Sequence, residues 1–215
     1  ISFDENKHKL EIEDSGCGMT KEEIVSNLGT IANSGTLKFL QQAQAENKSA
    51  ENLIGQFGVG FYSVFMVAER VELTTRSWQV DSQAWEWTSS GGGQYEITPA
   101  KYNQRGTRVT IFLKEDAKEF CSKWKLESII KKYSNYLPFP VKVNDQTVNQ
   151  VKAIWTQSKS DVEEDQYKEF FKQISHTGQE PLHYMHFSID APIQYYALLY
   201  FPESVGNEIV YSRES

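Results

Sequence analysis

An aspartate followed by two closely spaced glycines is the first group in the chain that could do chemistry. Asp14 ends a segment of alternating apolar and polar residues, and Gly16 and Gly18 follow it. Because glycine has no Cβ, the backbone at these positions can approach a flat ligand closely. A buried carboxylate beside such a turn would accept a hydrogen bond from the exocyclic amine of adenine. Taken alone, the same residues also fit an ordinary turn, in which Asp and Gly are both favoured.

A second glycine-rich segment has the composition of a phosphate-binding loop. Gly55, Gly58 and Gly60 lead into the apolar segment 62–67, which we predict to be a helix. Backbone N–H groups at a helix N-terminus favour anions, and glycines let several of them converge on phosphate oxygens. A Rossmann dinucleotide motif would need a strand before it and a parallel sheet around it, and neither is indicated here. On its own, the segment fits a packing turn before a buried helix equally well.

The elements that must position these motifs are short strands and a few helices. Alternating residues predict a strand over 8–14, and Thr20 with Glu23 forms the capping box of a helix that ends at Gly29. Further strands are predicted over 69–76, 83–88, 94–98 and 107–113, and the short turns between them are typical of an antiparallel meander. Gly106-Thr107 opens the last of these strands, and alone it reads as a turn. One amphipathic helix is predicted over 119–136, before Pro138.

The character of the chain changes near residue 150, where we place a boundary between a domain of residues 1–149 and a second one of residues 150–215. An acidic helix start lies at 160–165, and the aromatic and apolar run 193–201 predicts a buried strand.

The composition argues against a nucleic-acid-binding protein and against a membrane-inserted one. The chain has 215 residues, 39% of them hydrophobic, and a net charge of −7, so it can bury a globular core but lacks the clustered basic residues that nucleic-acid binding needs. It contains no apolar run of about 18 residues, so we expect no membrane insertion. Cys17 and Cys121 lack the spacing of metal ligands, no metal-binding motif is present, and reduced thiols in an intracellular or organellar compartment are expected.

The order of the three glycine motifs resembles the ATPase superfamily of gyrase B, MutL, histidine kinases and the ninety-kilodalton heat-shock chaperones. The segments 15–20, 27–32 and 54–63 are most similar to the heat-shock chaperones, and 132–140 and 153–155 extend the match over essentially the whole chain. Within that family the chain resembles the mitochondrial branch, with the bacterial branch close. The resemblance implies an α+β fold: a two-layer α/β sandwich of the Bergerat (GHKL) type, with an antiparallel-rich sheet covered by helices, followed by a partial α/β middle domain.

The resemblance also implies ATP or ADP with Mg²⁺ as the bound group. Asp14 would read the adenine amine with Thr107 helping through water, Met19 would pack on the base, and Asn27 would lie near the phosphates. Residues of about 20–54 would form a lid over the nucleotide. The other implied contacts are Gly18, Leu28, Asn33, Gln56, Gly58, Val59, Gly60 and Phe61. Many relatives carry a basic residue where this chain has Asn33.

The implied function is that of an ATP-dependent chaperone that hydrolyses ATP as a full-length homodimer and remodels client proteins, in the mitochondrial matrix or the bacterial cytoplasm. The family's helix with the catalytic Glu and the Mg²⁺-binding Asn lies upstream of the first strand and is absent, so we expect the first helices to be missing and this chain alone to be inactive. No residue here is catalytic by motif. Ser212-Arg213-Glu214 resembles part of the family's catalytic Arg loop, but Val210 and Tyr211 before it favour an earlier strand.

Two other functions fit parts of the pattern. A gyrase B or MutL type of ATPase would have a basic second domain for DNA, and residues 150–215 are not basic. A nucleotide-binding module without hydrolysis would fit if the natural chain began at Ile1.

Overall fold

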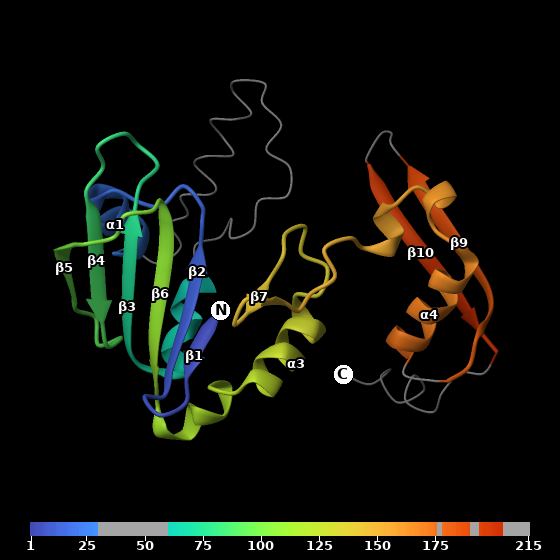
Figure 1. The fold of residues 1–215 in the computed structure, drawn as a ribbon, viewed down its shortest axis with the longest axis horizontal. Coiled ribbons are helices and arrows are strands. Elements are labelled where there is room, and N and C mark those ends of the chain that lie inside the picture. The colour runs from blue at the N-terminus through green and yellow to red at the C-terminus, as the bar shows by residue number, and fades with distance from the viewer. Residues whose placement is uncertain (30–59, 176–177, 190–193, 204–215) are drawn as a thin grey trace. The chain divides into compact units, whose positions relative to one another are not determined.

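The computed structural model describes residues 1–29, 60–175, 178–189 and 194–203. The chain divides into two compact units, one of Ile1–Asn135 with Pro140–Asn149 and one of Tyr136–Phe139 with Gln150–Ser215. The first unit contains a six-stranded sheet (Figure 1). Its strands are β1 (Ser2–Asp4), β2 (Lys9–Asp14), β3 (Ala68–Arg76), β4 (Ala84–Ser89), β5 (Tyr95–Ala100) and β6 (Gly106–Leu113). The predicted α+β class with an antiparallel sheet is confirmed.

The strands pair in the order β1-β2-β6-β3-β4-β5, and every pair is antiparallel. The predicted meander is right for β3, β4 and β5 but wrong for β6, which crosses back to lie between β2 and β3. The physical reason is burial, because β6 carries Val109, Ile111 and Leu113 on one face and gains most from the centre of the sheet. The crossing places the start of β6 beside the end of β2.

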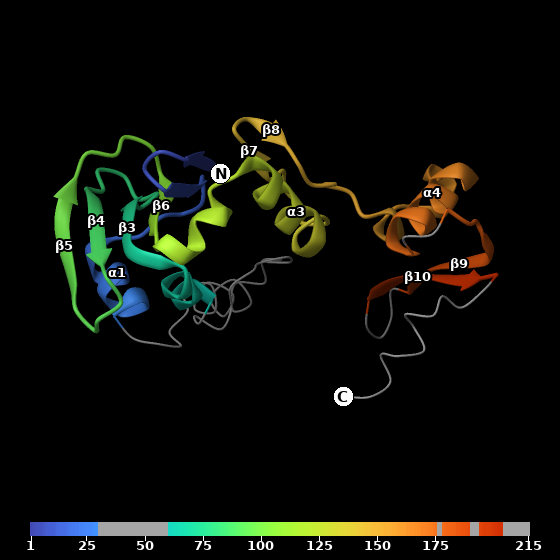
Figure 2. The same cartoon turned by 90° about the horizontal axis from the view of Figure 1, so that it is seen from below.

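One face of this sheet forms the hydrophobic core. Leu10, Val71, Leu73, Trp87 and Ile111 all lie on it and are buried. Helix α1 (Lys21–Leu28) and the 3₁₀ helix η1 (Gly60–Met66) lie on the same side of the sheet (Figure 2). The fully buried Ile24 of α1 and the partly buried Phe61 of η1 pack against this face. The helix predicted over 62–67 is therefore present, but it is a 3₁₀ helix that begins at Gly60.

The start of α1 is fixed by its predicted capping box. The Thr20 hydroxyl accepts from the Glu23 N–H at 3.3 Å, and the Glu23 carboxylate accepts from the Thr20 N–H at 2.7 Å. Such a reciprocal pair satisfies two of the free N–H groups at a helix N-terminus. The helix therefore begins at Lys21, two residues after Met19.

The single helix predicted over 119–136 is wrong, because the segment is broken in two. A 3₁₀ helix, η2 (Glu115–Phe120), is followed by α3 (Lys123–Tyr133). Ser122 takes an extended conformation between them, and its hydroxyl accepts from the Lys125 N–H at 3.3 Å. A serine in this role caps a new helix instead of continuing the old one. The hairpin of β7 (Lys142–Val143) and β8 (Gln146–Thr147) completes this unit.

The second unit pairs a helix with a two-stranded sheet. It consists of η3 (Ile154–Thr156), η4 (Lys159–Asp161), α4 (Glu164–Ser175), β9 (Pro181–Ile189) and β10 (Tyr195–Pro202). The strand predicted over 193–201 is present as β10, but its predicted burial is wrong, since Tyr195 and Leu199 are 50% and 49% exposed. Among the described residues, β10 pairs with one strand, β9. Helix α4 contacts the strand through Phe171, which packs against Tyr200. No helix in the described ranges is both long and apolar enough to cross a membrane.

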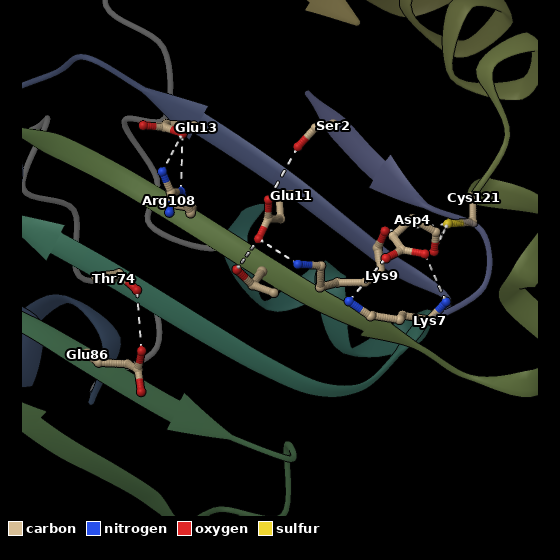
Figure 3. Close-up of polar contacts among 11 residues, drawn as sticks. Ser2, Asp4, Lys7, Lys9, Glu11, Glu13, Thr74, Glu86, Arg108 and Cys121 are labelled. Atoms are coloured by element: carbon tan, nitrogen blue, oxygen red, sulfur yellow. Dashed lines mark hydrogen bonds and ion pairs between the residues drawn. The ribbon is translucent and has the colours of Figure 1, made fainter. Parts of the chain in front are cut away.

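The face of the six-stranded sheet opposite the helices is polar (Figure 3). Glu11 accepts from Lys9 Nζ at 3.1 Å and from the Ser2 hydroxyl at 3.3 Å, and Glu13 pairs with Arg108 at 3.0 Å. These contacts are partly exposed, as expected of a solvated sheet face. A site that excludes water must therefore lie on the helix side of the sheet.

Candidate functional site

Asp14 is the last residue of β2 and begins a tight turn. Its Oδ1 accepts from the Gly16 N–H at 2.8 Å, and a Cβ at Gly16 would lie 2.8 Å from the same oxygen. The ordinary turn that the sequence also allows is therefore present. The expected burial of the carboxylate is not, because Asp14 is exposed. β1 pairs only with Lys9–Glu11, so at its end β2 has β6 as its single neighbour in the sheet.

The turn continues against the end of β3 with no room for a side chain at Gly18. Gly18 has φ +62°, and a Cβ there would lie 1.8 Å from the carbonyl oxygen of Arg76. The Trp78 N–H donates to the Cys17 carbonyl at 2.8 Å. Both the positive φ and the close backbone contact require glycine. The structure thus gives a packing reason for glycine at position 18, and the approach of a flat ligand to it stays a prediction.

Asp14, Thr107 and Thr75 stand in one row across three neighbouring strands. Asp14 of β2 is the register partner of Thr107 of β6, which is in turn the partner of Thr75 of β3. Side chains at such positions lie about 5 Å apart at Cβ and point to the same face. Gly106, with φ +116°, keeps the strands close, because its Cβ would lie 2.2 Å from the Asp14 carbonyl oxygen. The structure thus brings the first and third glycine motifs together.

Thr75 links this row to the turn, and the sequence interpretation missed it. The residue is fully buried, and its hydroxyl accepts from the Met19 N–H at 3.0 Å, donates to the Gly106 carbonyl at 2.9 Å and lies 3.0 Å from Thr107 Oγ1. A signal was available, since Val71 and Leu73 precede Thr75 on the core-facing positions of an alternating strand. A polar residue that continues an apolar register must find hydrogen-bond partners.

The remaining described site residues lie on or beside the two helices that cover this face. The Asn27 amide lies 4.0 Å from the Met19 sulfur, and the Leu28 carbonyl accepts from the Tyr62 hydroxyl at 3.2 Å. Phe61 contacts Trp87 edge-on, with ring centroids 5.6 Å apart. Gly60, the first residue of η1, is exposed. The Leu28–Tyr62 contact joins the end of α1 to η1, so these residues lie near one another.

Several sequence predictions lie outside the described residues: Gly55 and residues 30–54 of the predicted lid, together with Asn33, Gln56, Gly58, Val59 and Arg213. The part of the chain that the structure describes therefore holds the base-reading end of the predicted site and only the last glycine of the phosphate motif. Within it, no three His, Cys, Asp or Glu side chains are grouped as metal ligands. The described arrangement places acceptor oxygens of Asp14 and Thr107 beside Gly18 and Gly106, whose packing against neighbouring backbone leaves no room for a Cβ.

Two family models match the chain. Residues 1–109 match the family of histidine kinase-, DNA gyrase B- and HSP90-like ATPases, and residues 142–215 match the Hsp90 protein family. The first match spans half of the chain and contains all three glycine motifs, from Asp14 to Thr107.

Curated relatives match along nearly the entire chain. The chaperone protein HtpG of Desulfitobacterium hafniense is 50% identical over 205 residues, which is 95% of this chain and 33% of that protein. The HtpG proteins of Chlorobium phaeovibrioides and Chlorobaculum tepidum are 45% and 41% identical over 98% and 99% of this chain, and over 34% of their own lengths. The chain thus spans about a third of the length of the curated relatives it matches.

Proposed function

This chain belongs to the Hsp90 family, within the ATPases that also include gyrase B and the histidine kinases, and we propose that it is the nucleotide-binding part of an ATP-dependent chaperone. The observation that carries the proposal is the row of Asp14, Thr107 and Thr75 next to the Gly16–Gly18 turn. It offers a carboxylate and a hydroxyl to an amine, at the end of the sheet where Gly18 and Gly106 let the turn and the strands pack closely.

In this proposal the adenine amine donates to Asp14, Met19 supplies apolar surface near the base, and the backbone of Gly60 and Phe61 contacts the phosphates. The Met19 side chain already packs partly against the core, so little conformational entropy is lost when a ligand contacts it. We propose that Mg²⁺ enters with the nucleotide, because Mg²⁺ is usually bound through substrate phosphates together with one or two protein ligands. The lid of about 20–54, hydrolysis in a homodimer and the remodelling of client proteins are part of the same proposal.

The match of residues 142–215 favours a chaperone over a DNA-handling ATPase. That segment matches the Hsp90 protein family, whereas gyrase B shares with this chain only the ATPase model of residues 1–109. The relatives named above are bacterial, which favours a bacterial cytoplasmic protein. The mitochondrial location stays a prediction that rests on the resemblance alone.

Calorimetric titration with Mg-ATP tests the proposal on the longest natural form of the protein. We expect saturable binding that Asp14→Asn weakens about 10–150-fold, because a hydrogen bond to a charged group contributes about 1.5–3 kcal/mol. Glu13→Gln is the matched control, since Glu13 is the neighbouring carboxylate of the same strand and points to the polar face, where it pairs with Arg108. Equal binding by the unsubstituted protein and Asp14→Asn would refute the assignment of Asp14 as the base-reading residue.

Steady-state ATP hydrolysis by the same proteins separates binding from turnover. A chaperone ATPase predicts turnover that Asp14→Asn reduces and Glu13→Gln leaves unchanged. Saturable binding without turnover would instead support the nucleotide-binding module without hydrolysis.

A further inference from the structure

We propose that Thr75 is a positioning residue that selects the base of the nucleotide, because it forces Thr107 to act as a hydrogen-bond acceptor toward the ligand. This inference rests on the proposed function, since it concerns how a bound purine is chosen. It predicts a preference for a purine with an amine at C6 over one with a carbonyl there.

The Thr75 hydroxyl has three hydrogen-bonding partners in the structure. A hydroxyl has one proton and two lone pairs. The Gly106 carbonyl, 2.9 Å away, can only accept, so it takes the proton. The Met19 N–H, 3.0 Å away, can only donate, so it occupies one lone pair. Thr75 has no exposed surface, so exchange with solvent does not rearrange these bonds.

One lone pair of Thr75 is left, and it sets the role of Thr107. The two hydroxyl oxygens lie 3.0 Å apart, so Thr107 must donate its proton to Thr75. The Thr107 hydroxyl can then act only as a hydrogen-bond acceptor toward a bound ligand. Its register partner Asp14 offers a carboxylate, which also accepts and does not donate. The side chains that face each other across β2 and β6 therefore present acceptors only.

An acceptor-only site distinguishes two purines of almost the same shape. Adenine carries an amine at C6, whose protons satisfy such acceptors. Hypoxanthine carries a carbonyl at C6, which would face them lone pair to lone pair, and its one donor on that edge, N1–H, lies beside the carbonyl and not at the position of the amine. A site built to hydrogen-bond one group rejects an analogue that leaves its polar atoms unpaired. If Thr75 lost its hydroxyl, Thr107 would be free to rotate and donate to that carbonyl.

The test compares binding of Mg-ATP and Mg-ITP by calorimetry in the longest natural form of the protein. Thr75→Val keeps the side-chain shape and removes the hydroxyl, whereas Thr75→Ser keeps the hydroxyl. Thr110→Val is the matched control, because Thr110 is another buried threonine, on β6, whose hydroxyl bonds to Glu11 on the opposite face.

We expect the ratio of the ITP to the ATP dissociation constant to fall about 2–10-fold in Thr75→Val, the range of one net hydrogen bond. The ratio should stay at the unsubstituted value in Thr75→Ser and Thr110→Val. A ratio is informative here because general loosening of the fold weakens both nucleotides together. An unchanged ratio in a folded Thr75→Val protein would therefore overturn the proposal and leave Thr75 a structural residue.

Thr107→Val keeps the proposal testable if Thr75→Val does not fold. If Thr107 accepts from the ligand side, removing its hydroxyl weakens ATP more than ITP and lowers the ratio. If Thr107 donates to the ligand, the substitution weakens ITP binding more than ATP binding, and the ratio rises, which contradicts the proposal. Failure of the unsubstituted protein to bind either nucleotide would overturn the proposed function and this inference together, whereas an unchanged ratio overturns this inference only.

Discussion

Replacing Gly18 with alanine tests the close contact between the turn after β2 and the end of β3. Two separate costs apply. A residue with a Cβ loses about 1–2 kcal/mol in the left-handed region, where Gly18 lies with φ +62°. The added Cβ would also lie 1.8 Å from the Arg76 carbonyl oxygen, a backbone atom in a paired strand, and such overpacking costs about 1–3 kcal/mol more. We expect Gly18→Ala to lower the free energy of unfolding by about 2–5 kcal/mol, the sum of these ranges.

Gly93→Ala separates the two costs. Gly93 also has a positive φ, of +82°, but a Cβ there would meet no atom within 4 Å. Only the backbone cost remains, so we expect a loss of about 1–2 kcal/mol. Urea unfolding followed by tryptophan fluorescence measures both variants, because four of the five tryptophans, Trp78, Trp85, Trp87 and Trp124, lie in the first unit. Equal losses for the two variants would refute the contact with Arg76.

Two further predictions concern acid stability and thiol reactivity. Burial raises the pKa of Glu11, but the hydrogen bond and charge of Lys9 and the charge of Arg108 outweigh it and hold that pKa below its usual value of 4.5. The ionised Glu11 therefore stabilises the folded state above its unfolded-state pKa, and this contribution is lost as pH falls through the lower folded-state pKa. Because Glu11→Gln lacks this contribution, its urea midpoint should decline less than that of the unsubstituted protein on acidification below about pH 4.5. A decline equal to that of the unsubstituted protein would contradict this. Burial raises the pKa of the Cys121 thiol, whereas Cys17 is exposed, so a thiol reagent should label Cys17 quickly and Cys121 only upon unfolding. A fast labelling phase that persists in Cys17→Ser would contradict the expectation for Cys121.

Local patterns in the sequence predicted local structure well. The capping box of Thr20 and Glu23 specifies where α1 begins, because its hydrogen bonds join residues only three positions apart. Alternation of apolar and polar residues predicted the strands for a similar reason, since side chains in a strand alternate between the two faces. The glycine at position 18 was identified by its motif, and its physical requirement is now a specific contact with Arg76.

Two of the features that were missed depend on residues distant in the sequence. The place of β6 between β2 and β3 is decided by which strand gains most from central burial, and no pattern within β6 records that competition. Thr75 was missed because its partners, Met19 and Gly106, are 56 and 31 positions away. The break at Ser122 is different, because its capping bond to the Lys125 N–H is local, and it was missed because the residues on both sides suit a helix.

The position of the candidate site follows from the register of the core. On the helix side of the sheet, one row across β2, β6 and β3 is Leu10, Ile111 and Val71, and the next is Ile12, Val109 and Leu73. The third row is Asp14, Thr107 and Thr75. The site is thus the continuation of the hydrophobic core by one row, where apolar side chains give way to polar ones.

This continuity couples ligand binding to correct strand pairing. A slip of one residue in β2 would turn Leu10 away from the core and Asp14 toward the polar face at the same time, because successive side chains point to opposite faces. The burial of Leu10 and its row therefore holds Asp14 on the side where Thr107, the Gly18 turn and the two helices lie. The same apolar rows that stabilise the sheet therefore also hold the carboxylate on the side of the proposed nucleotide site.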